Sequence, residues 1–187
     1  MQNLITYLHG IMPISDHLQN HLAGIVKTKT LAKKEYLLQR GSVCRNIYFI
    51  KSGILRRFHL DGDIEVTTCF MMKNDVVYNV ADFCDQTPSN EFIQAIGRTE
   101  VLYISFDELQ CIRTQFQEFN FIYVKILVHC HALAEERNHI LRMPLTESRV
   151  KYMWEKHPVV MGYVPRKLLA SYLRCTPENL SRVQGKR

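Results

Sequence analysis

The spacing of hydrophobic residues changes twice along the chain. Residues 1 to about 27 carry apolar side chains at helical spacing, with Pro13 as an interruption and Ser15 as a suitable cap for a second helix. From Lys33 the period becomes two, and turn sequences such as Ser52-Gly53 separate the apolar runs. The candidate strands are 35–38, 46–51, 54–59, 65–70, 91–95 and 101–105. Many short strands at this spacing predict an antiparallel barrel or sandwich.

Helical spacing returns after the last strand. Ser105 is a suitable cap for one helix, and a longer helix follows from about 118 to 142. One apolar stripe on this helix consists of Phe119, Ile122, Ile126, Leu133 and Ile140. A second row to one side consists of Tyr123, Leu127, Cys130 and Ala134. Because two stripes on a helix of about 37 Å are hard to bury in one small chain, we expect the first stripe to meet the same helix of a second copy in a parallel dimer. The alternative is that both stripes pack within one chain.

The last stretch predicts two short helices joined by a tight turn. Met143-Pro144-Leu145 ends the long helix, another helix runs from Thr146 to about 157, and 158–163 is a short link. Pro165 can open the first short helix, and Thr176-Pro177-Glu178 can open the second. This arrangement is typical of a helix-turn-helix, whose second helix enters the major groove of DNA.

The polar residues of this hairpin suit contact with duplex DNA. Arg182 can fork onto guanine or a phosphate, Glu178 can accept from cytosine, and Asn179 or Ser181 can bond bases or the DNA backbone. The residues that suit the phosphate backbone are Thr176, Arg166, Lys167 and Arg174. Arg174 stands near the turn, where a positive φ favours glycine. The alternative is an ordinary helical hairpin with a surface Glu–Arg pair.

The distribution of charge favours the DNA-binding interpretation. The formal net charge is +6. From Pro144 onward there are nine Lys and Arg against three Glu, so this segment accounts for the whole excess. Positive charge gathered on one segment is the electrostatic signature of a nucleic-acid-binding domain.

Other classes of function have less support. The six cysteines include no Cys-x-x-Cys pair, and His129 and His131 would point to different sides of a helix, so we predict no metal and no cofactor. An enzyme on a cupin-like barrel would need clustered ligands on strands, and only His59 lies on a candidate strand. No apolar run is long enough to cross a bilayer and the first residues lack a signal-peptide pattern, so we expect a soluble cytoplasmic protein with no membrane partner.

The order of these elements resembles the Crp/Fnr family of bacterial transcription regulators. Tyr36 to Gly41 followed by Ile47 to Gly53 is similar to the start of a cyclic-nucleotide-binding β-roll, and Arg166 to Arg182 is similar to the DNA-reading unit of the family. The resemblance implies an α+β fold, with an N-terminal antiparallel β-roll (jelly-roll-like, the cyclic-nucleotide-binding-domain fold), a long dimerisation helix and a small C-terminal (winged-)helix-turn-helix domain. The expected boundaries are 1–117, 118–143 and 144–187. The resemblance also implies a homodimer on double-stranded DNA with a two-fold-symmetric operator, with RNA polymerase and an unknown small-molecule effector as further candidate partners.

One departure from the family pattern concerns the cyclic phosphate. Nucleotide-binding members have a Gly-Glu-Leu turn and an Arg-Ser/Thr pair where this chain has 78–81 and Ser89-Asn90. No Lys or Arg lies between Lys73 and Arg98, whereas three Asp and one Glu do. A phosphate would meet carboxylates without a cationic clamp. We therefore predict no cyclic-nucleotide binding, and the barrel either takes another effector or serves as a dimer scaffold.

A second departure concerns the DNA-reading end. Pro177 stands where the family often has Arg, and the 158–164 link is short for a wing hairpin. A small-molecule-sensing or protein-interaction module with weakened or lost DNA binding is therefore the alternative to the regulator.

Overall fold

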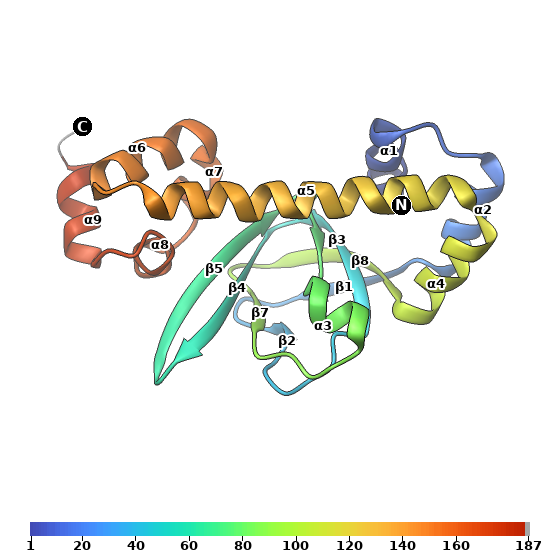
Figure 1. Ribbon diagram of the computed structural model, residues 1–187, viewed down its shortest axis with the longest axis horizontal. Helices are drawn as coiled ribbons and strands as arrows, with labels where there is room; N and C mark the ends of the chain where they lie inside the picture. The colour runs from blue at the N-terminus through green and yellow to red at the C-terminus, as the bar shows by residue number, and fades with distance from the viewer. Residues whose placement is uncertain (186–187) are drawn as a thin grey trace. The chain divides into compact units, whose positions relative to one another are not determined.

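The computed structural model describes residues 1–185 (Figure 1). The chain separates into two compact units. One is formed by Met1–Arg56 and Met71–His129, and the other by Arg57–Phe70 and the chain from Cys130 onward. This division differs from the three expected segments, because one β-hairpin and the second half of the long helix group with the C-terminal helices.

The strands form two antiparallel four-stranded sheets within the described residues. The strands are β1 (Lys27–Leu31), β2 (Tyr36–Leu38), β3 (Asn46–Ser52), β4 (Ile54–Asp61), β5 (Ile64–Met72), β6 (Val76–Val77), β7 (Phe92–Ala95) and β8 (Thr99–Ser105). Their order is β1-β8-β3-β6 in one sheet and β2-β7-β4-β5 in the other. All six predicted strands are present, and the expected antiparallel β-roll is confirmed.

Helices precede and follow the roll (Figure 1). They are α1 (Gln2–Ile11), α2 (Asp16–Ile25), α3 (Val80–Asp85), α4 (Phe106–Gln115), α5 (Gln117–Arg142), α6 (Thr146–Lys156), α7 (Pro158–Tyr163), α8 (Arg166–Tyr172) and α9 (Pro177–Gln184). The predicted caps are confirmed. Ser15 accepts from the Leu18 amide at 3.2 Å, and Ser105 and Glu108 form a reciprocal capping box at the start of α4.

One strand was not predicted and one assignment is wrong, and local sequence explains both. Strand β1 follows the two N-terminal helices directly, where no element was expected, because its sequence Lys-Thr-Lys-Thr-Leu leaves four of five residues exposed and lacks an apolar alternation. The link at 158–163 is the helix α7, with Pro158 in its first turn. Proline at that position is a helix-start signal that could have revealed α7.

Gly53 is required by the turn between β3 and β4. Its φ is +94°, and a Cβ atom would lie 2.7 Å from the Arg98 carbonyl oxygen. Any other residue would force the neighbouring turn at Arg98 and Thr99 to move. The turn signal at Ser52-Gly53 therefore marks a close approach of two backbone segments.

Candidate nucleic-acid interface and dimer helix

Helices α8 and α9 form the predicted hairpin. The chain turns through Arg174, whose φ of 50° lies in the left-handed region. The Cys175 amide closes the turn by donating to the Ala170 carbonyl oxygen at 3.0 Å. Leu169, Leu173 and Leu180 are buried. Arg174 thus holds, at a cost of about 1 kcal/mol, a conformation that glycine adopts freely.

The start of α9 is set by its own residues, as predicted. Thr176 Oγ1 accepts a hydrogen bond from the Asn179 amide at 3.1 Å. Pro177 lies in the first turn, where its missing N–H loses no bond. Glu178 is exposed in the same turn and lies near the positive end of the helix.

The polar face of α9 is partly organised by internal hydrogen bonds. Glu178 and Arg182 are both exposed. Arg182 Nη2 donates to Asn179 Oδ1 at 3.0 Å, and Asn179 Nδ2 donates to Thr146 Oγ1 of α6 at 3.4 Å. Arg182 is therefore oriented by Asn179, and Asn179 itself is half-buried.

The predicted backbone-contacting cations are solvent-exposed. Arg166 and Lys167 begin α8, and Arg174 lies in the turn. Arg166 Nη1 also donates to Ser181 Oγ at 3.4 Å, which links the two helices. Lys186 and Arg187, two further cations of the same positively charged segment that are expected to add phosphate contacts, lie outside the described residues.

Helix α5 uses its predicted dimer stripe inside the chain. Phe119, Ile122, Ile126 and Ile140 are all buried, and Leu133 is half-buried. The start of α5 is tied to the N-terminal helices, because Ser15 donates to Glu118 Oε1 through its amide at 3.0 Å and its hydroxyl at 2.7 Å. Packing within one chain, the alternative to the dimer, therefore accounts for four of the five residues in the predicted stripe.

A different row on α5 is exposed. The side chains of Phe121, Val124 and Val128 are 49, 54 and 57% exposed. Their spacing of three and four residues places them on one face of the helix, and exposed Ala132 continues that face. The row was not predicted from the sequence, where the stripe that starts at Phe119 contains more apolar residues.

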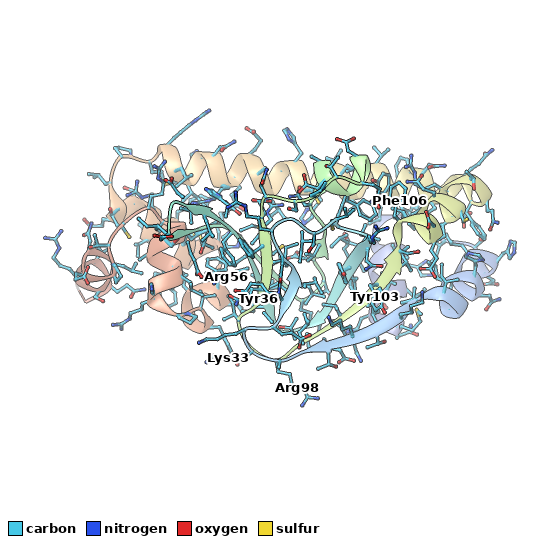
Figure 2. All side chains as sticks on the ribbon, turned by 90° about the horizontal axis from the view of Figure 1, so that it is seen from below. Lys33, Tyr36, Arg56, Arg98, Tyr103 and Phe106 are labelled. Atoms are coloured by element: carbon cyan, nitrogen blue, oxygen red, sulfur yellow. The ribbon has the colours of Figure 1, made fainter. Side chains whose placement is uncertain are left out.

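The region expected to hold a cyclic phosphate is occupied by a polar network. Asn79 Nδ2 donates to Glu91 Oε2 at 2.9 Å and to Ser89 Oγ at 3.3 Å. The Glu91 amide donates to Ser89 Oγ at 3.0 Å, and Ser89 is 1% exposed. Arg98, the next cation along the chain, lies in an outer turn beside that of Lys33, with its side chain pointing into solvent (Figure 2).

Two searches of the described residues bear on other classes of function. Among the helices of residues 1–185, none is long and apolar enough to cross a membrane. The same residues contain no group of three or more His, Cys, Asp or Glu side chains that could hold a metal ion.

Comparison with known proteins defines the class of fold. Residues 28–115 match the cyclic nucleotide-binding domain family. The chain resembles FixK2 from Bradyrhizobium japonicum, with a TM-score of 0.72 and 18% identity over 87% of this chain and 84% of that chain. It also resembles the c-di-GMP responsive global regulator CLP of Xanthomonas campestris, with a TM-score of 0.72 and 16% identity over 92 and 91% of the two chains. For the catabolite activator protein of Thermus thermophilus the TM-score is 0.56, with 17% identity over 96 and 85%.

These likenesses confirm the fold predicted from the sequence. The chain has the fold of the Crp/Fnr regulators, and the match to the cyclic nucleotide-binding domain family covers residues 28–115 of that fold. No curated protein sequence matches it.

Proposed function

We propose that the protein is a homodimeric, DNA-binding transcription regulator of the Crp/Fnr type that does not respond to cyclic nucleotides. One observation carries the proposal. The capped helix α9 presents Glu178 and Arg182 to solvent, within the segment that holds the whole net positive charge of the chain. RNA polymerase is a further candidate partner for such a regulator.

The residues divide into two roles on DNA. Arg182 and Glu178 contact base edges in the major groove, and Asn179 holds Arg182 in place. Ser181 contributes a hydroxyl on the same helix. The phosphate backbone is contacted by Thr176, Arg166, Lys167 and Arg174.

The dimer forms through the exposed row Phe121, Val124 and Val128 of α5. Apolar side chains at alternating spacings of three and four are the pattern by which parallel helices pair. This row replaces the five residues first predicted to form the dimer contact, since four of those five are already buried in one chain.

The absence of a cyclic-nucleotide response is proposed from the Asn79–Ser89–Glu91 network. A cyclic phosphate in this region would meet the Glu91 carboxylate, and like charges at hydrogen-bond distance repel strongly in a partly buried site. We expect the unfolding temperature to stay unchanged when cyclic AMP or cyclic GMP is added. A dose-dependent rise would contradict this part of the proposal.

The proposal is tested by selecting bound duplexes from a random-sequence pool across a salt series. We expect a two-fold-symmetric motif and a steep salt slope. Arg182→Ala should weaken binding to the selected site by about 1–3 kcal/mol and relax one base preference in each half-site. Arg98→Ala, which removes an exposed arginine from the roll, is the matched control.

Two results would count against the proposal. Equal loss on all sequences would make Arg182 a phosphate contact rather than a base contact. Sequence-blind or absent binding by the wild-type dimer would favour the alternative function.

That alternative is a small-molecule-sensing module on the same fold. One observation favours it, a cavity of about 300 Å³ lined by residues of β2, β3 and the loop between them, including Arg45 and Asn46. This volume is at the lower limit of small-molecule sites, which span about 300–1,000 Å³. Absence of duplex binding by an intact dimer would select this alternative.

A further inference from the structure

Strand β5 is an edge strand of its sheet, and helix α8 packs against its free edge. In the described sheet order β2-β7-β4-β5, strand β5 has a strand partner on one side only. The free edge of such a strand presents backbone N–H and C=O groups that need partners. The unit that contains Arg57–Phe70 also contains α8, and these two segments meet at that edge.

One hydroxyl group satisfies two of the edge groups. The Thr67 amide donates to Ser171 Oγ at 2.9 Å, and Ser171 Oγ donates to the Glu65 carbonyl oxygen at 2.9 Å. A serine hydroxyl can donate once and accept as well, so Ser171 replaces both bonds of a neighbouring strand.

A cation and two aromatic rings extend this contact. Arg137 of α5 donates through Nη2 to the Thr67 carbonyl oxygen at 3.3 Å. Its Cζ atom lies 3.9 Å from the centroid of the Tyr172 ring, and that ring packs against Phe70 with centroids 5.0 Å apart. Three elements distant in sequence, β5, α5 and α8, therefore converge on one small cluster.

The contact leaves the DNA-reading side chains free. Ser171 and Tyr172 lie at the C-terminal end of α8, whereas Glu178 and Arg182 on α9 remain exposed. The β5 edge therefore holds the hairpin without masking its polar face.

We propose that the β5 edge fixes the orientation of α8 and α9, and that Ser171 and Arg137 are positioning residues that set the half-site spacing read by the dimer. The inference rests on the proposed function. Two copies of α9 can occupy successive major grooves only when each is held at a defined angle. A contact that fixes this angle before binding removes an ordering cost and sharpens discrimination between spacings.

The contact itself is tested without DNA. Exchange of the Thr67 amide hydrogen should be faster in Ser171→Ala than in the wild type, because its acceptor is lost. Ser148→Ala is the matched control, since Ser148 is an exposed serine on α6. Ser171→Thr keeps the hydroxyl and should keep slow exchange. Unchanged exchange in Ser171→Ala would overturn the proposal.

The positioning role is tested with operators that carry the selected half-sites at different separations. The wild type should prefer one separation by about tenfold or more, because half-sites off the helical repeat cannot be engaged together. Ser171→Ala and Arg137→Lys should reduce this preference to about twofold while a single half-site is bound as before. Arg137→Lys keeps the positive charge, so its effect does not arise from weaker attraction to DNA.

The outcomes separate the two proposals. A wild type that binds no specific duplex overturns the proposed function and, with it, this inference. A wild type with a sharp spacing preference that both variants retain leaves the function standing and overturns the positioning role.

Discussion

We propose separate roles for the two faces of α5, one in the core of the chain and one in the dimer, and two substitutions distinguish them. Ile122 is fully buried, so Ile122→Ala removes side-chain atoms from the core and leaves a cavity. Such truncations lower the free energy of unfolding by about 2–5 kcal/mol. Val124 is 54% exposed, so Val124→Glu removes little packing within one chain. In a dimer it would bring two carboxylates into the apolar seam.

The magnitudes can be compared in one experiment. Urea unfolding followed at several protein concentrations reports chain stability and association together, because a dimer unfolds at a concentration-dependent midpoint. Ile122→Ala should lower the midpoint at every concentration. Val124→Glu should weaken association by at least about tenfold, or ~1.4 kcal/mol, and remove the concentration dependence. Val159→Glu, at a valine of similar exposure on α7, is the control and should leave association unchanged.

The reverse pattern would refute this reasoning. If Ile122→Ala dissociated the dimer without lowering chain stability, and Val124→Glu remained dimeric, the seam would be the stripe that begins at Phe119. Sedimentation equilibrium of both variants decides between the two faces.

Three further predictions concern local features. Gly62→Ala has open space and should cost about 1–2 kcal/mol for its positive φ. Gly53→Ala should cost more than Gly62→Ala, because its Cβ would also meet the Arg98 backbone, and urea unfolding compares the two variants. Thr176→Ala removes the cap of α9 and should lower stability by about 1 kcal/mol in the same assay. Hydrogen bonds from Ser105, chiefly from its amide, lower the pKa of Glu108, so its contribution is present above the unfolded pKa of about 4.3 and is lost as the pH falls through the lower folded value. Glu108→Gln should therefore flatten the fall in stability at acid pH, as measured by thermal unfolding across a pH series.

Elements with local signals were predictable from the sequence. The α8–α9 hairpin was predictable because Pro165 before α8 and the Thr176 cap of α9 each act within a few residues of their positions. The helix cap at Ser105 could be predicted from the sequence for the same reason. The polar strand β1 was missed because its pairing with β8, more than 60 residues away, replaces the missing apolar pattern.

The faces of α5 and the β5–α8 contact could not be predicted in this way. A heptad pattern shows which residues of a helix share a face, but not what covers that face. The cover for Phe119 and Ile126 includes Leu8 and Leu22, which line the same small cavity but come from α1 and α2. Ser171 carries no signal in its own sequence, because its partners are backbone groups of a strand about a hundred residues earlier.

The grouping of the β4–β5 hairpin with the C-terminal helices has a consequence for protein engineering. A fragment cut at the hinge near Pro144 would contain the helix-turn-helix but would lose Thr67 and Arg137, the partners of α8. A chimaera that tests the proposed DNA specificity in a known regulator should therefore carry residues 57–70 and the end of α5 together with the C-terminal helices. What a chimaera must transfer is a set of contacting segments rather than a continuous stretch of chain.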